Sequence, residues 1–262
     1  MIVDSHCHLD FDDFNADRDA VMARARQAGI GVLLTIGIRV RQFERVLAIA
    51  ERYPHVYCSV GTLPHFSDEE RDVTAAELVN LARHPKVVGI GEAGLDRFYG
   101  NASWDAQIEV FQAHIEASRQ TQLPLIIHSV REDEAMADML IRETKKGTFP
   151  IVMHCFSGGP ALAETALSLG AYVSFSGLLT YPENAALRDI AATIPDDKLL
   201  VETDAPSQVP VPLLEERNEP AFILKTIDVL AIARNTRPEI VMRQTASNFF
   251  SAFAKVSQRL IM

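Results

Sequence analysis

The chain has 262 residues, of which 48% are hydrophobic, so it can bury a sizeable core without disulfide or metal staples. Its formal net charge of −10 excludes a broad basic surface that would hold nucleic acid by counterion release. The three cysteines form no C-x-x-C pair, the N-terminus lacks the pattern of a signal peptide, and no apolar run approaches the roughly 18–20 residues of a membrane span. We therefore expect a cytoplasmic protein without a membrane contact, and no obligate protein partner is evident.

Short apolar runs alternate along the chain with longer stretches whose apolar residues have helical spacing. The runs span residues 2–3, 32–36, 56–60, 87–90, 125–127, 151–153, 171–175 and 199–201. Helical faces are formed by Phe43, Val46, Leu47 and Ala50, by Ile108, Phe111 and Ile115, and by Ile223, Ile227 and Leu230. The runs are continuously apolar, which is typical of parallel strands buried on both faces. The pattern predicts an α/β fold, a single-domain (β/α)8 TIM barrel over residues 1–262. A doubly wound open sheet is the alternative, because periodicity cannot show whether a sheet closes.

Several of these runs end in residue types that bind metals. The residues are His6, His8, Glu92, His128, His154 and Asp204. In a TIM barrel the carboxyl ends of the strands form the catalytic face, so we expect these side chains to converge there. Together they predict a metal centre, although His128 or His154 alone would more often be a core residue.

The His6-Cys7-His8 segment is the most specific of these signals. Side chains two apart on a strand point the same way, so both imidazoles face one side and Cys7 faces the other. Two imidazoles converging at a strand end suit zinc, manganese or iron. The alternative is a pair of hydrogen-bonded histidines beside Asp4.

Glu92 indicates the form of the centre. A carboxylate can bridge two cations through its two oxygens, so we predict two divalent metal ions, one activating water and both holding the transferring group. Asp204 is then a ligand, the base for the attacking water, or both, which makes Glu92 and Asp204 the expected catalytic residues. Glu202 shares the strand of Asp204 and is expected to orient a ligand from behind.

Other patterns carry less weight. Residues 89–94 match G-x-G-x-x-G, but Glu92 would put negative charge where a pyrophosphate binds, so we expect these glycines to serve close backbone packing. Ser157 lacks the surrounding G-x-S-x-G elbow of a nucleophile. Cys7 and Cys155 are expected to be small buried residues, pointing away from the neighbouring histidines. Trp104 stands alone, and no aromatic series suggests base stacking.

The chain resembles the TatD family of metal-dependent deoxyribonucleases, which are amidohydrolase-like barrels. The matching segments are Asp4-Ser5-His6-Cys7-His8-Leu9-Asp10, Gly91-Glu92-Ala93-Gly94-Leu95-Asp96, Ile127-His128-Ser129, His154-Cys155-Phe156-Ser157-Gly158, Ser174-Phe175-Ser176-Gly177, Glu202-Thr203-Asp204-Ala205-Pro206 and Arg217-Asn218-Glu219-Pro220. They occur in order over essentially the whole chain. The resemblance implies a phosphodiesterase dependent on Mg²⁺, Mn²⁺ or Zn²⁺, often a 3′→5′ exonuclease on DNA, and it implies the same six metal ligands.

The chain departs from the family pattern around the expected substrate. Leu63 replaces the first histidine of Gly-x-His-Pro-His, Val130 replaces an arginine, and Arg97 replaces an aromatic residue. The candidate phosphate contacts are His65, Arg97, Arg131 and Arg217. The departures leave open which substrate is cleaved: DNA, another phosphoester, or a small amide or lactone hydrolysed by the same metal-activated water. A non-catalytic binding protein is the remaining alternative, against which stands the full set of expected ligands.

Overall fold

The structure, a computed structural model, describes residues 1–100 and 102–256. Within these residues, parallel strands form one sheet in the order β1 to β8. The strands are β1 (Ile2–Cys7), β2 (Ile30–Thr35), β3 (Val56–Val60), β4 (Val87–Asp96), β5 (Leu125–Val130), β6 (Ile151–Met153), β7 (Tyr172–Phe175) and β8 (Leu199–Val201). Each lies at one of the predicted apolar runs, so the alternating pattern located them correctly.

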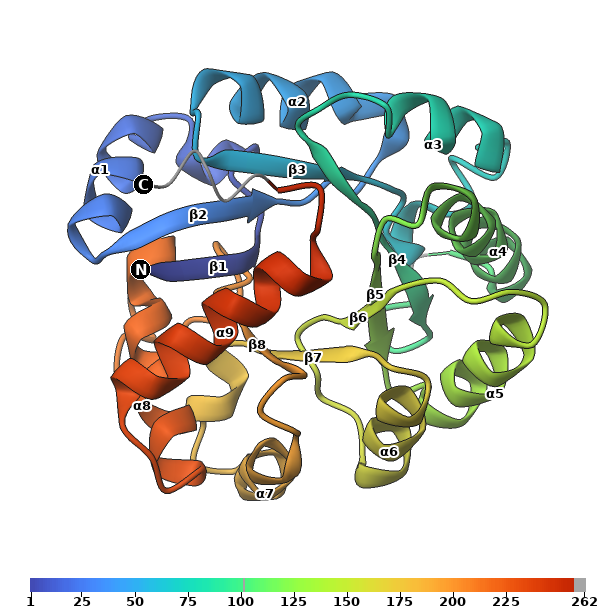
Figure 1. Cartoon of the computed structure of the whole chain (residues 1–262). Coiled ribbons are helices and arrows are strands. Elements are labelled where there is room, and N and C mark those ends of the chain that lie inside the picture. Colours follow the sequence, from blue (N-terminus) through green and yellow to red (C-terminus); the bar gives the residue numbers. More distant parts are fainter. Residues whose placement is uncertain (101, 257–262) are drawn as a thin grey trace.

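Helices follow the strands and surround the sheet (Figure 1). They are α1 (Arg18–Gln27), α2 (Phe43–Arg52), α3 (Ala75–Leu81), α4 (Trp104–Thr121), α5 (Asp133–Thr144), α6 (Pro160–Ser168), α7 (Ala185–Thr193), α8 (Ile223–Ala233) and α9 (Pro238–Ala252). Their starts follow local chemistry. The side chains of Thr74 and Ser103 accept hydrogen bonds from the first turns of α3 and α4, and a proline opens α6 and α9.

The sheet closes into a barrel because β8 and its following loop reach β1. Asp204 N donates to His6 O at 2.9 Å, and His8 N donates to Ala205 O at 2.8 Å. The Ser5 hydroxyl also donates to Val201 O at 3.0 Å. The predicted TIM barrel is therefore confirmed, and the open doubly wound sheet is excluded.

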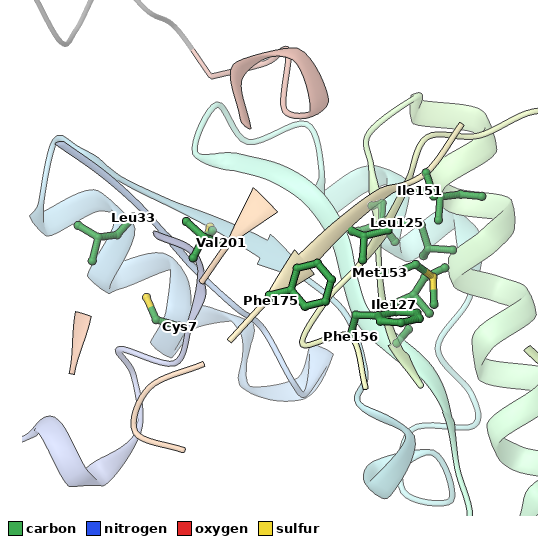
Figure 2. Close-up of a cluster of buried hydrophobic side chains, with 14 of the residues drawn as sticks. Cys7, Leu33, Leu125, Ile127, Ile151, Met153, Phe156, Phe175 and Val201 are labelled. Carbon is green, nitrogen blue, oxygen red and sulfur yellow. The ribbon is translucent and has the colours of Figure 1, made fainter. Parts of the chain in front are cut away.

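The apolar core has two parts, one inside the barrel and one outside. Inside, side chains such as Val88 and Ile126 pack on Phe249 and Phe253. Helix α9, red in Figure 1, lies across this end of the barrel. Outside, strand side chains pack against the surrounding helices, and Figure 2 shows part of this cluster, with Cys7 among the apolar residues. Since α9 fills one end, the opposite end is left for the polar side chains.

The glycines of β4 permit close strand packing. A Cβ on Gly94 would lie 1.8 Å from His128 O, and a Cβ on Gly91 would lie 2.6 Å from Ile126 O. The G-x-G-x-x-G segment is thus part of a strand rather than a phosphate-binding turn, as the sequence indicated. None of the helices described over residues 1–100 and 102–256 is long and apolar enough to cross a membrane.

Candidate metal centre

The first group of candidate ligands comes from β1, β4 and the turn after β8. His6 Nε2 and His8 Nε2 face each other at 3.3 Å, while the intervening Cys7 points into the outer core. His6 Nε2 lies 3.4 Å from Glu92 Oε2 and 3.6 Å from Asp204 Oδ1. His8 Nε2 lies 3.9 Å and 3.3 Å from the same two oxygens. The strand alternation therefore directs both imidazoles to one point, as predicted.

These separations fit a cation better than they fit direct contacts. Four ligands about 2.1 Å from a metal in tetrahedral geometry lie about 3.4 Å from one another. The five separations given above run from 3.3 to 3.9 Å around that value. Two imidazoles and two carboxylates are also a donor set that divalent metals accept. The first group is thus shaped to hold one divalent ion.

The second group uses the other oxygen of Glu92. His128 Nδ1 lies 2.7 Å from Glu92 Oε1, and His154 Nε2 lies 2.8 Å from the same atom. Each of these pairs is at hydrogen-bonding distance, so a cation here requires the imidazoles to move slightly outward. His154 stacks on His6 with ring centroids 3.8 Å apart, which places the two groups side by side. Glu92 therefore presents one oxygen to each group, as a bridging carboxylate must.

Two further buried carboxylates stand behind the second group. His154 Nδ1 lies 3.1 Å from Glu202 Oε1, and His128 Nε2 lies 2.9 Å from Asp96 Oδ2. A carboxylate only accepts hydrogen bonds, so each contact holds a proton on the far ring nitrogen and leaves the near nitrogen to face a metal. The role expected for Glu202 agrees with this contact. Asp96 was not anticipated, although its spacing of four from Glu92 on one strand puts both side chains on the same face.

Burial and charge set the ionisation of these groups. Burial by itself raises the pKa of Glu92, but His154, His128 and His6 outweigh it and hold that pKa well below its usual value. Burial likewise acts to raise the pKa of Asp204, and the hydrogen bond with His8 reverses it. Both carboxylates are therefore ionised at neutral pH. Divalent cations can take over the balancing role of the imidazole protons, since metal binding displaces protons from its ligands.

The centre lies at the base of a cavity of about 370 Å³. His8, Glu92, His128, His154 and Asp204 contribute to its floor, and apolar residues form part of its wall. The apolar wall residues are Phe11, Ile38, Leu63 and Leu178. A molecule in this cavity is thus in contact with the candidate ligands and with an apolar surface.

The four candidate phosphate contacts are placed differently. His65 lines the cavity, and its Nε2 donates to Asp96 Oδ2 at 2.9 Å. Arg131 lines a neighbouring hollow that shares Val130 and Ser157 with the cavity, and Arg97 lies beyond it. Arg217 instead binds both oxygens of Asp17 at 2.9 Å and does not line the cavity within the described residues. The structure therefore brings His65 to the centre and the two other arginines near its rim.

Three expectations about strand ends and side-chain direction were wrong. Glu92 does not end its strand, because β4 continues to Asp96, and β5 continues to Val130 beyond His128. Glu202 and Asp204 do not share a strand, because β8 ends at Val201 and both residues lie in the turn that follows it. Cys155 is partly exposed and lines the cavity, with its Sγ 3.0 Å from Ser176 Oγ. Strand alternation does not apply to it, because β6 ends at Met153 and the backbone of Cys155 is left-handed, with φ of 41°.

Comparison with known proteins agrees with this geometry. A sequence model of the family described as TatD related DNase matches residues 3–254. The chain belongs to the TatD family. The Escherichia coli K12 protein YjjV, named an uncharacterized metal-dependent hydrolase, is 33% identical over 96% of this chain and 97% of its own length. The crystal structure of YjjV matches with a TM-score of 0.89 and 32% identity, covering 97% of this chain and 98% of YjjV.

A second TatD-family relative has a named activity. The Salmonella typhimurium protein named 3′-5′ ssDNA/RNA exonuclease TatD is 30% identical over 95% of this chain and 97% of its own length. The present protein is thus a TatD-family metal-dependent hydrolase with a single barrel, as its sequence predicted. Among the described residues, the groups able to hold a metal ion include His6, His8 and Glu92, and also Glu92, His128 and His154.

Proposed function

We propose that this protein hydrolyses phosphodiester bonds of nucleic acid as a 3′→5′ exonuclease on DNA, with two divalent metal ions and an activated water. The observation that carries the proposal is the position of Glu92, with one oxygen facing His6 and His8 and the other facing His128 and His154. The similarity to the Salmonella exonuclease supports the choice of nucleic acid. His6, His8, Glu92, His128, His154 and Asp204 are the proposed ligands.

The chemistry divides between the metals and the chain. When bound, two divalent ions lower the pKa of water and neutralise charge on phosphoryl oxygens. Asp204 lies at the cavity floor and is ionised, so its carboxylate can accept the proton of the attacking water. His65 lines the same cavity and is held by Asp96, which suits it to contact a phosphate oxygen. Attack of the water on phosphorus breaks the bond to the 3′ oxygen of the penultimate nucleotide. That oxygen takes up a proton from solvent, and the terminal nucleotide leaves with its 5′-phosphate.

The test uses a 5′-labelled single-stranded DNA with added Mg²⁺ or Mn²⁺. We expect products shortened one nucleotide at a time from the 3′ end, with activity lost on adding a chelator. Asp204→Asn is expected to slow cleavage roughly 10²- to 10⁴-fold, the range typical of a lost general base. Equal rates for the wild type and Asp204→Asn would remove Asp204 from the proposed mechanism.

A second candidate is hydrolysis of a small amide, lactone or phosphoester. The apolar wall of the cavity favours it, because Leu63 and Leu178 offer no hydrogen bond to a phosphate. A panel of such substrates, assayed with the same metals, decides between the two. A higher kcat/KM for a small carbonyl substrate than for DNA would select this alternative. We further infer a cytoplasmic location, which the three free thiols support.

A further inference from the structure

Two exposed aromatic rings lie next to the metal centre. Phe98 and Tyr99 follow the end of β4 after Arg97, and the two residues are 49% and 55% exposed. The ring centroids are 4.9 Å apart at an interplanar angle of 79°. Among residues 1–100 and 102–256, no other phenylalanine, tyrosine or tryptophan is as exposed to solvent. Contact of such rings with water is unfavourable, so a ligand that covers them gains free energy of binding.

The rings are tied to the centre by one buried carboxylate. Asp96 Oδ1 accepts hydrogen bonds from Phe98 N at 2.8 Å and from Tyr99 N at 3.1 Å. Its Oδ2 accepts from His65 and from His128, each at 2.9 Å. Tyr99 also lines the cavity, with its ring centroid 5.2 Å from that of His65. The position of the rings is thus fixed relative to the proposed metal ligands.

Two guanidinium groups lie beside the rings, in a hollow that the carboxylates of Glu132, Asp133, Glu134 and Asp138 also line. The guanidinium of Arg131 lies 4.0 Å from the centroid of Phe98. The guanidinium of Arg97 lies 3.6 Å from the centroid of Trp104, which opens α4. The guanidinium of Arg97 lies 3.8 Å from the carboxylate of Glu132, which is longer than a direct hydrogen bond, and its side chain is 58% exposed. A phosphate can therefore approach it. Planar apolar faces beside cations are what a single-stranded nucleic acid requires, because its bases are unpaired and its backbone is anionic.

We propose that Phe98 and Tyr99 form a stacking site for an unpaired nucleobase of the substrate strand. The proposal rests on the proposed function and extends it, since it gives this chain a reason to select single strands. The base lies on the exposed rings at the rim while the scissile phosphate lies at the cavity floor. Arg97 and Arg131 neutralise phosphates of the adjoining nucleotides. A duplex end presents its bases already paired and stacked, and so it gains little here.

The test measures binding separately from cleavage. Asp204→Asn protein, at fixed Mg²⁺, is titrated against a fluorescent single strand with natural 3′-terminal nucleotides and against one with abasic 3′-terminal nucleotides. We expect Phe98→Leu and Tyr99→Leu in this background to raise the dissociation constant for the natural strand about tenfold each. The abasic strand is expected to bind weakly to Asp204→Asn protein that keeps both rings. Its dissociation constant should equal that of the natural strand for protein in which both rings are replaced by leucine. The control is Ile232→Ala, at an exposed apolar residue of α8, which should leave the dissociation constant unchanged.

Three outcomes count against the stacking site. Equal affinity for natural and abasic strands overturns it, and so does an unchanged dissociation constant in both leucine variants when thermal melting shows them folded. A monomer–dimer equilibrium that shifts in those variants, with nucleic-acid binding unaltered, assigns the rings to a second copy of the chain. Failure of the wild-type protein to cleave either oligonucleotides or bis(p-nitrophenyl) phosphate with any of the metals overturns the proposed function instead, so the two failures are distinguishable.

Discussion

Replacing Glu202 by glutamine tests whether a buried carboxylate orients His154, one of the proposed metal ligands. Glu202 is fully buried, and its Oε1 lies 3.1 Å from His154 Nδ1 while also accepting from Cys155 N at 2.7 Å. Glutamine keeps the size and one acceptor oxygen but removes the negative charge. The imidazole then loses part of the field that holds its proton on Nδ1 and leaves Nε2 for the metal.

The contact between Glu202 and His154 sets the size of the expected loss of metal affinity. Loss of a carboxylate behind a metal-binding histidine typically lowers metal affinity by about 10- to 100-fold. That range corresponds to about 1.4 to 2.8 kcal/mol of binding free energy. Because Asp204, the proposed proton acceptor, is untouched, we expect activity to return when excess metal is added. A change that damaged the chemistry itself would persist at saturating metal.

In the assay, chelator-treated protein is titrated with Mn²⁺. Metal binding is measured by calorimetry, and activity is measured as the rate of DNA cleavage at each metal concentration. Glu143→Gln is the matched control, because Glu143 is a buried carboxylate on α5 whose partners are Arg142, Lys146 and Arg119. We expect the midpoint of the metal titration to rise in Glu202→Gln and to stay constant in Glu143→Gln. Superimposable titrations for Glu202→Gln and wild type would refute the reasoning.

Three further predictions concern stability. Burial lowers the pKa of His114 from 6.5 to about 4, so the unfolded chain binds a proton between these values that the folded chain does not. The free energy of unfolding should therefore rise by about 3 kcal/mol from pH 4 to 6.5, and urea denaturation should show this contribution disappear in His114→Gln. Mn²⁺ at about 100 times its dissociation constant should stabilise the wild type by about 2.7 kcal/mol for each ion bound in thermal melts, and Asp204→Asn less. Gly94→Ala should cost roughly 3 kcal/mol or more by the same measurement, because its Cβ would lie 1.8 Å from His128 O; a melting temperature equal to wild type would contradict this.

The barrel was predictable because its signal is strong and repeated. Parallel strands covered on both faces must be apolar throughout, and each apolar run coincides with a strand. Strand length was less predictable where function interrupts that pattern. After Ile90, β4 carries Gly91, Glu92, Gly94 and Asp96, which read as a loop by composition. The strand is irregular at Gly91 and Glu92 and resumes its pairing with β5 from Ala93 to Asp96. Closure of the sheet depended on contacts between β8 and β1, which local patterns do not encode.

The convergence of the candidate ligands was predictable because all strands of a barrel run in the same direction. His6 and His8 converge because alternate residues share a face, and the other candidate ligands join them at the carboxyl end of the barrel. The surroundings were less predictable. Arg217 is bound by Asp17, 200 residues away in the sequence, and no local signal reveals that pairing. Phe98 and Tyr99 form no aromatic series in the sequence, and no local pattern reveals that Tyr99 lies beside His65 in space.

The charge of this centre links metal binding to substrate binding. Glu92, Asp204, Glu202 and Asp96 place four carboxylates around the histidines, in a chain whose net charge is already −10. Without added positive charge such a cavity repels a polyanion, and the nearby arginines are too few and too exposed to reverse that repulsion alone. Divalent ions are the strongest local charges a protein can place in so small a volume. Metal occupancy is therefore expected to govern affinity for nucleic acid as well as the rate of cleavage, with the aromatic rim contributing attraction that does not depend on charge.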